Sequence, residues 1–390
     1  MMIDPTLGVT APQGFLAAGV TAGLKVSGKP DLALVVSAGP AWAAAAQFTS
    51  NRFAAAPVQW SRGVLAGGAV RAVVLNSGGA NACTGAQGAA DAAAMAAAVG
   101  AAIGCPPDAV VVGSTGLIGA MLPMDKVRAG IAAAARTATV DGGDAAARAI
   151  LTTDKVTKQA GYCSPAGWRI GGMAKGAGML APALATMLVV ITTDAAVTST
   201  EADAALRAAT TVSFDCADSD GCMSTNDMVL LMANGASGVQ PDAGEFAEAL
   251  AAVSISLARQ LIADAEGAEH AITVTVTDAA SRADALEVAR AIARSNLFKC
   301  AIAGNDPNWG RVLAAMGTTG AAFDPDAVDV YFNDVGVFLG GAPGVPRDQV
   351  DLTPFETTVT VRLHAGDAAA TIWTNDLTHG YVSENADYSS

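Results

Sequence analysis

The chain has few charged residues and lacks several features that mark disulfide-rich, metal-binding or nucleic-acid-binding proteins. Only 15% of its 390 residues are charged, and no run of five Lys and Arg occurs, which argues against a nucleic-acid partner. The six cysteines form no Cys-x-x-Cys pair, and the three histidines stand far from any pair of cysteines. We therefore expect reduced thiols in a cytoplasmic protein and no metal site.

Long hydrophobic runs are also absent. The longest apolar stretches, 92–104 and 179–191, are shorter than the ~20 residues that a membrane-spanning helix needs. The first residues, Met-Met-Ile-Asp-Pro, lack the basic and apolar regions of a secretory signal. With 52% hydrophobic residues and a net charge of −14, the composition predicts a soluble α/β protein with a substantial core.

Familiar phosphate-binding and hydrolase motifs fail in this chain. The Gly-x-Gly-x-x-Gly pattern at 176–181 ends in Ala181, and no Gly-Lys-Ser/Thr run exists. The Gly-x-Ser-x-Gly elbow fails because Val112 takes the first glycine position. Nucleotide binding and an ordinary serine-hydrolase site are therefore both disfavoured.

Apolar periodicity predicts a mixed α/β fold whose topology the pattern leaves open. Helices are expected at 89–102, 124–136, from Thr200 onward, 245–265 and 283–293. Strands are expected at 70–76, 109–112, 271–276, 328–339 and 356–363, with the last two paired. The irregular stretch 160–178 is expected to be a surface loop that is open to cleavage.

The most informative segment runs from Lys175 to Leu188, where a Gly-rich turn leads through Ala185 and Thr186 into an apolar run. A threonine hydroxyl is a weak nucleophile unless a base adjoins it. A cut between Ala185 and Thr186 would supply that base, because the freed α-amine has a reference pKa near 7.7–8.0. The alternative is a loop that enters a buried strand with one satisfied threonine.

Blocks along the whole chain point to one family. They are 8–15, 75–85, 114–119, 152–154, 175–188, 220–227, 264–267, 304–311 and 384–390. In type and order these blocks resemble the ornithine acetyltransferases, the bifunctional arginine-biosynthesis family also called ArgJ. Ala177 and Ala183 stand where many members have Ser and Asn. Since neither is the nucleophile, these differences bear on the rate of cleavage more than on the chemistry.

The resemblance implies self-cleavage into an α chain of residues 1–185 and a β chain of residues 186–390, intertwined in one structural unit. It implies a layered helix–sheet–sheet–helix sandwich, of the type shared with self-processing aminopeptidases. It also implies an assembly of two α and two β chains.

The resemblance assigns roles to particular residues. Thr186 would be the nucleophile, and the Thr115 hydroxyl with the Gly116 N–H would form the oxyanion hole. The residues implied to contact the substrate are Thr152, Lys175, Thr186, Glu266, Asn385 and Ser390. From the sequence itself, Lys175 is a lysine in an apolar region, suited to hold a substrate carboxylate or to favour the neutral amine, and the alternative is a solvated loop lysine. Glu266 ends the predicted helix 245–265, where the helix dipole does not favour an acidic group. This suits a substrate-binding carboxylate, and the alternative is a frayed helix end at the surface.

The implied reaction moves the acetyl group of N2-acetyl-L-ornithine to L-glutamate through an acetyl-threonine, in a ping-pong scheme. No metal or bound organic cofactor is implied, and acetyl-CoA is a second donor for some members. Three alternatives stay open. One is a related self-cleaving amidohydrolase or aminopeptidase, one an acetyltransferase of secondary metabolism, and one an uncleaved amino-acid-binding protein.

Overall fold

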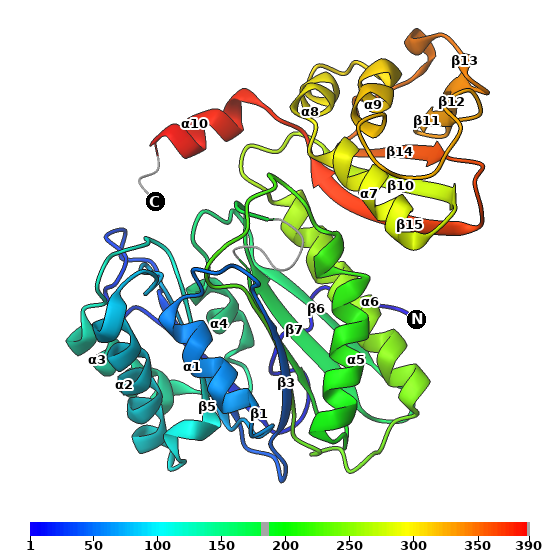
Figure 1. Ribbon diagram of the computed structural model, residues 1–390. Helices are drawn as coiled ribbons and strands as arrows, with labels where there is room; N and C mark the ends of the chain where they lie inside the picture. The colour runs from blue at the N-terminus through cyan, green and yellow to red at the C-terminus, as the bar shows by residue number, and fades with distance from the viewer. Residues whose placement is uncertain (181–186, 388–390) are drawn as a thin grey trace. The chain divides into compact units, whose positions relative to one another are not determined.

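The computed structural model describes residues 1–180 and 187–387, which form two compact units (Figure 1). Unit 1 comprises Met1–Asp215 and Met223–Leu261, and unit 2 comprises Cys216–Cys222 and Ile262–Ser389. The predicted cut after Ala185 falls inside unit 1, so both predicted chains contribute strands to this unit. The chain limits 1–185 and 186–390 stay a prediction.

Unit 1 contains two β-sheets. The first has the order β1-β2-β4-β5, from β1 (Phe15–Val20), β2 (Leu32–Ser37), β4 (Ala72–Ser77) and β5 (Val110–Thr115). The second has the order β3-β9-β8-β7-β6, from β3 (Ala43–Phe48), β9 (Met228–Ala233), β8 (Leu188–Thr193), β7 (Arg169–Lys175) and β6 (Lys158–Cys163). The pairs β4–β5 and β8–β9 are parallel and the other neighbours are antiparallel.

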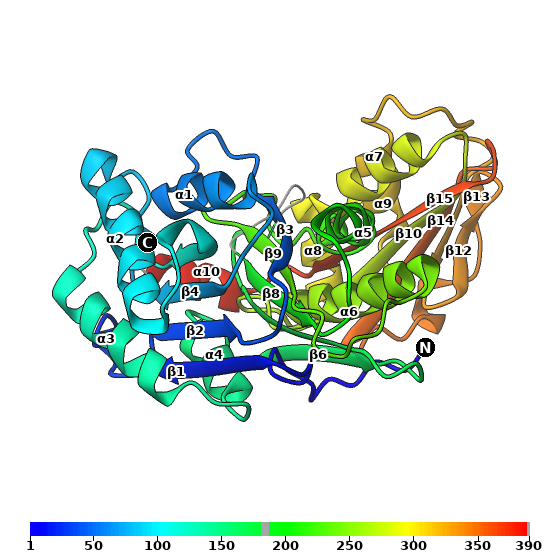
Figure 2. The same cartoon turned by 90° about the horizontal axis from the view of Figure 1, so that it is seen from below.

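The two sheets of unit 1 pack face to face, and helices cover their outer faces (Figures 1 and 2). One core cluster joins Val73 and Val111 of the first sheet to Val190 and Leu230 of the second. The helices of this unit are α1 (Ala56–Leu65), α2 (Gly85–Ile103), α3 (Met124–Thr137), α4 (Gly143–Ala149), α5 (Ser199–Thr211) and α6 (Ala243–Ala263). Helices α2 and α3 cover the first sheet, and α5 and α6 the second. The predicted helix–sheet–sheet–helix sandwich is confirmed.

Unit 2 is one sheet with helices packed against it. The sheet order is β13-β12-β11-β14-β10-β15. Its strands are β10 (Ala271–Ala279), β11 (Asp329–Phe332), β12 (Val335–Leu339), β13 (Ala342–Pro343), β14 (Glu356–Arg362) and β15 (Ala368–Asn375), and its helices are α7 (Arg282–Ala293), α8 (Asn296–Ala303), α9 (Trp309–Met316) and α10 (His379–Asp387). Its core joins Val274 and Val359 of the sheet to Val288 of α7 and Val312 of α9.

Three local predictions are wrong. The expected strand 328–339 is the hairpin β11–β12, because Asn333 and Asp334 both take positive φ at its turn. The stretch 160–178 is no surface loop, since most of it forms the antiparallel pair β6–β7 with buried residues. Helix α5 begins at Ser199, one residue before the expected start at Thr200, because Thr198 caps it through a capping box with Glu201. The expected pairing of the last strands is confirmed by β11–β14.

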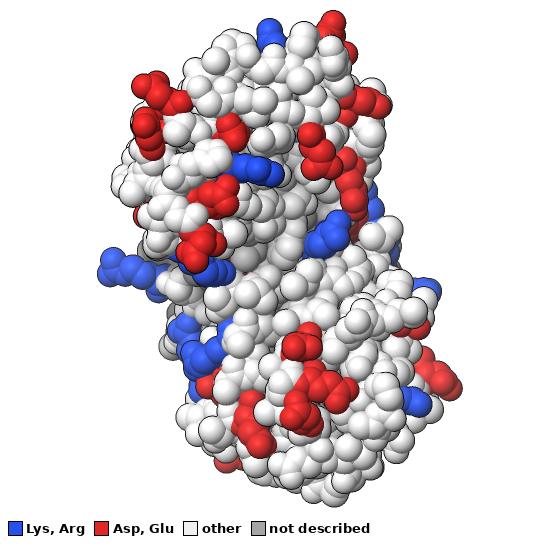
Figure 3. All heavy atoms as spheres, turned by 90° about the vertical axis from the view of Figure 1, so that its right-hand side faces the viewer, with Lys and Arg blue, Asp and Glu red and all other residues white. Residues whose placement is uncertain are grey.

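Two helices, α2 and α6, are long and apolar enough to cross a membrane. Buried residues of α2 such as Met95 and Val99 pack in the core of the first sheet, as in a core helix of a globular protein. On the face drawn in Figure 3, Lys and Arg are scattered among acidic side chains and form no continuous basic surface.

Candidate functional site

Thr115 lies at the carboxyl end of β5, in the turn that the sequence predicted to be functional. The parallel register places Ser77 of β4 opposite it. The N–H groups of Gly78 and Gly79 both donate to the Thr115 carbonyl oxygen, at 2.9 and 3.1 Å. Gly116 has φ +124°, and a Cβ there would lie 2.7 Å from the Gly79 nitrogen, so only glycine fits. The two turns therefore interlock and fix Thr115, which is buried.

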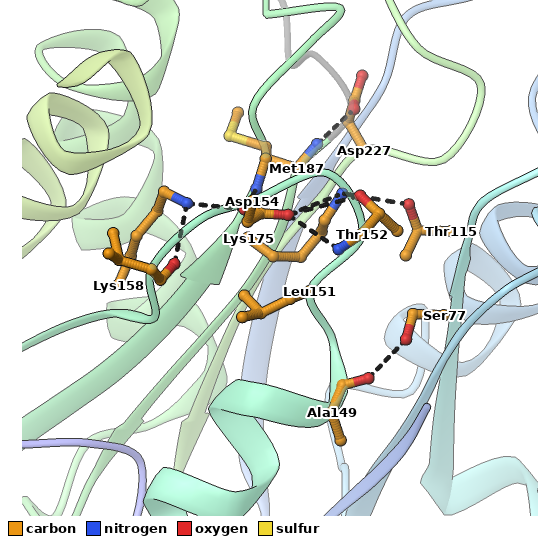
Figure 4. A network of polar contacts seen from close by, with 12 residues as sticks. Ser77, Thr115, Ala149, Leu151, Thr152, Asp154, Lys158, Lys175, Met187 and Asp227 are labelled. Carbon is orange, nitrogen blue, oxygen red and sulfur yellow. Dashed lines mark hydrogen bonds and ion pairs between the residues drawn. The ribbon is translucent and has the colours of Figure 1, made fainter. Parts of the chain in front are cut away.

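Lys175, the last residue of β7, is a buried cation among hydroxyl groups. Its side chain is 1% exposed. Its Nζ donates to Thr152 Oγ1 at 2.7 Å and to Thr115 Oγ1 at 3.4 Å (Figure 4). The structure thus brings three of the predicted site residues together, although they are 23 and 60 residues apart in the chain.

Asp154 balances the charge of two buried lysines (Figure 4). Its carboxylate, itself fully buried, accepts a hydrogen bond from Lys158 Nζ at 2.7 Å and lies 3.8 Å from Lys175 Nζ. The backbone N–H groups of Thr152 and Gly176 also donate to it, at 3.0 and 2.6 Å. Burial raises the pKa of Asp154, but the two lysines outweigh burial and hold the pKa below its ordinary value. Asp154 is therefore ionised at neutral pH.

Lys25 supports the loop that carries Thr152. Its Nζ donates to the carbonyl oxygens of Leu151 and Pro30, at 2.7 and 2.8 Å. Burial lowers the pKa of Lys25 to about 8, partly offset by the Asp31 carboxylate. A third lysine therefore fixes the backbone next to Thr152, the predicted substrate contact.

The start of β8 is held by β9. Leu188 pairs with Lys175 on one side and with Met228 on the other. The Met187 carbonyl accepts the Met228 N–H at 3.1 Å, and the Met187 N–H donates to Asp227 Oδ1, also at 3.1 Å. Burial raises the pKa of the Asp227 carboxyl well above its ordinary value.

The sequence analysis gave no role to Asp154 or Asp227. Both lie in blocks that carry the family resemblance, 152–154 and 220–227. The only local signal for Asp154 is Lys158 four residues later. The Met187 N–H that bonds Asp227 lies 40 residues earlier in the chain, so no local pattern indicates this contact.

Ala185, Thr186 and Ser390, like Ala183, lie outside the described residues. The predicted nucleophile, the cleavage site and the last substrate contact therefore stay predictions from the sequence.

In unit 2 the structure brings Glu266 and Asn385 together. Asn385, on α10, donates from Nδ2 to Glu266 Oε2 at 2.9 Å. Glu266 is buried and lies just after α6 ends, rather than at the helix terminus that was predicted. A Cβ at Gly267, where φ is +65°, would lie 2.0 Å from the Tyr381 nitrogen, so this turn and α10 pack backbone to backbone. Thr378 Oγ1 also donates to the Gly267 carbonyl, at 2.6 Å.

Comparison with known proteins decides the family. The family model described as "ArgJ family" matches residues 16–390. The chain belongs to the ArgJ family. It is 59% identical to the arginine biosynthesis bifunctional protein ArgJ of Thermobifida fusca and 58% identical to that of Streptomyces coelicolor, in each case over 98% of this chain and 100% of the relative. The ArgJ protein of Mycobacterium leprae is 55% identical over 98% of this chain and 96% of its own length.

A solved structure of ornithine acetyltransferase complexed with ornithine, from Mycobacterium tuberculosis, is 52% identical and covers 48% of this chain and 99% of that chain, with a TM-score of 0.46. The family model and the curated relatives confirm the resemblance to the ArgJ family that the sequence indicated. They also confirm the expectation that this ArgJ-family chain is an enzyme of the acyltransferase class.

Proposed function

We propose that this ArgJ-family chain transfers the acetyl group of N2-acetyl-L-ornithine to L-glutamate through an acetyl ester on Thr186. The observation that carries the proposal is the convergence of Lys175 Nζ with the hydroxyls of Thr115 and Thr152. Lys175 pairs with Leu188, two residues after Thr186. The strand that follows the nucleophile thus begins beside the predicted oxyanion donor and the predicted substrate contacts.

In the first half-reaction, cleavage after Ala185 has already freed the Thr186 amine. The amine takes the proton of Thr186 Oγ as this oxygen attacks the acetyl carbonyl carbon. The Thr115 hydroxyl and the Gly116 N–H stabilise the oxyanion. The amide C–N bond then breaks, the ornithine nitrogen takes the proton from the Thr186 amine, and the acetyl group stays on the threonine.

In the second half-reaction, the α-amine of glutamate attacks the ester carbonyl and loses its proton to the Thr186 amine. The ester C–O bond breaks, Thr186 Oγ regains a proton, and N-acetyl-L-glutamate leaves. Lys175 would bind a substrate carboxylate, supported by Thr152. Glu266, with Asn385 and Ser390, would bind an ammonium group.

This chemistry needs no metal ion and no bound organic cofactor. We further propose that the enzyme works in the cytoplasm as two chains of residues 1–185 and two of residues 186–390. Acetyl-CoA is a candidate second donor to the same threonine.

The decisive experiment is intact mass with N-terminal sequencing, on the wild type and on Thr186→Ala. We expect the wild type to give two chains, one of which begins Thr-Met-Leu-Val-Val, and to gain one acetyl group on that chain when incubated with acetylornithine alone. Thr186→Ala should stay a single chain with no transfer. A wild type that stays uncut yet turns over would overturn the mechanism. Release of acetate without glutamate would instead indicate a hydrolase.

A further inference from the structure

The backbone of Met187 is held in a way that the rest of β8 is not. Along β8, neighbouring strands supply the hydrogen-bond partners of the backbone. At Met187 the carbonyl still bonds the backbone of Met228, but the N–H donates to a side chain, Asp227 Oδ1, at 3.1 Å. The backbone hydrogen bonds of β8 therefore give way to a side-chain carboxyl at Met187, the residue that directly follows Thr186.

Asp227 is held where it is by its own surroundings. Its side chain is fully buried, and its carbonyl oxygen accepts the Thr49 N–H at 3.1 Å. Within the described part of the chain, Oδ2 has no hydrogen-bond partner. The Met187 N–H therefore holds one oxygen of this carboxyl. Burial raises the pKa of Asp227, and hydrogen bonds with Met187, Thr49 and Ser224 oppose that rise.

We propose that Asp227 is a positioning residue that orients the Thr186 nucleophile by accepting the Met187 N–H. A peptide unit is planar, so a hydrogen bond on the Met187 N–H also orients the carbonyl and Cα of residue 186. The inference rests on the proposed function, since it gives Thr186 the role of nucleophile.

The test compares Asp227→Asn with Asp227→Leu in the full chain. Asn keeps a neutral carbonyl acceptor of the same size, whereas Leu keeps the size and removes the acceptor. We expect D227N to cleave and transfer within a few-fold of the wild type. D227L should cleave and turn over roughly 100-fold more slowly, the loss typical of a misplaced reacting group. The KM for acetylornithine should change little, because the substrate is bound by other residues.

Asp194 provides a matched control at the other end of β8. It is also buried, and its carboxyl accepts the N–H groups of Arg169 and Gln13 at 2.7 and 2.8 Å. D194L should lower the melting temperature yet form the two chains at the wild-type rate below that temperature. Equal slowing by D194L would reduce Asp227 to a structural role, and the inference would be wrong.

The remaining outcomes of these variants also test the proposal. A folded D227N that fails to cleave would mean that the carboxyl transfers a proton, which contradicts the proposal. If D227L is insoluble, D227A serves in its place, and wild-type rates in either variant would refute the role. These results are separate from the proposed function, which fails only if the wild type itself does not form the acetyl-threonine.

Discussion

The two groups of predicted substrate contacts, one in each unit, are built differently. In unit 1, Lys175 is buried and makes hydrogen bonds with Thr115 and Thr152. In unit 2, Glu266 is buried but its partner Asn385 is exposed on α10. The first group is joined by hydrogen bonds among buried side chains, whereas in the second a buried acid accepts a hydrogen bond from an exposed residue of α10.

The charges of the two groups differ as well. Lys175 and Lys158 with Asp154 leave one net positive charge buried in unit 1, and Glu266 brings a negative charge in unit 2. We therefore expect substitutions in the group of unit 1 to cost more stability than substitutions in the group of unit 2.

The largest loss of stability is expected for Asp154→Leu, which removes the carboxylate that lies beside two buried lysines. Breaking a buried ion pair from one side costs about 3–5 kcal/mol, so we expect the urea midpoint of unit 1 to fall steeply and activity to fall with it. Asp203→Asn, at an exposed pair with Arg207, should cost less than about 1 kcal/mol. Equal losses in the two variants would mean that the Asp154 cluster is not the fixed element we describe.

A variant in unit 2 should separate binding from folding. Glu266→Gln keeps an acceptor for Asn385 and removes the charge, so stability should hold. The KM for acetylornithine should rise roughly 10- to 100-fold, the range for a hydrogen bond to a charged group. Glu269→Gln, at an exposed position three residues later, is the control and should leave the KM unchanged. A Glu266→Gln enzyme with wild-type KM would remove Glu266 from the substrate site.

The sequence predicts well those helices and strands that form from local patterns. Helix α3, expected at 124–136, forms at Met124–Thr137, and strand β10, expected from residue 271, begins at Ala271. These elements follow local apolar periodicity, which the sequence displays directly. The hairpin β6–β7 was missed because its strands are rich in glycine and small residues. Pairing of β6 with β7 and of β7 with β8 stabilises them, rather than local propensity.

Site residues, too, are predicted where the sequence itself marks them and missed where only the fold supplies their partners. Lys175 stands out as a charge in an apolar stretch, and the motif around Thr115 is recognisable from the resemblance. Asp154 and Asp227 act through partners that the fold brings to them, Lys175 and Met187. A buried carboxyl looks like any other aspartate in the sequence, because its pKa depends on neighbours that only the tertiary structure supplies.

The smallest expected effect concerns pH and distinguishes the stability of the two units. Burial lowers the pKa of Lys299 in unit 2 to about 8, partly offset by Asp220 and Asp218. Its ordinary value in the unfolded chain is near 10.5. Between these two values the unfolded chain binds more protons than the folded one, so raising the pH through this window stabilises the folded state.

Lys299→Met should therefore lose part of the gain in unfolding free energy that the wild type shows between about pH 8 and pH 10. Lys25, in unit 1, also has its pKa lowered to about 8, and Lys25→Met should flatten the same slope in the transition of that unit. The exposed Lys29 serves as the control. Parallel pH curves for the wild type and Lys299→Met would contradict the assignment. If each variant lost the pH dependence of the unfolding free energy in both units, the two units would unfold in a single transition.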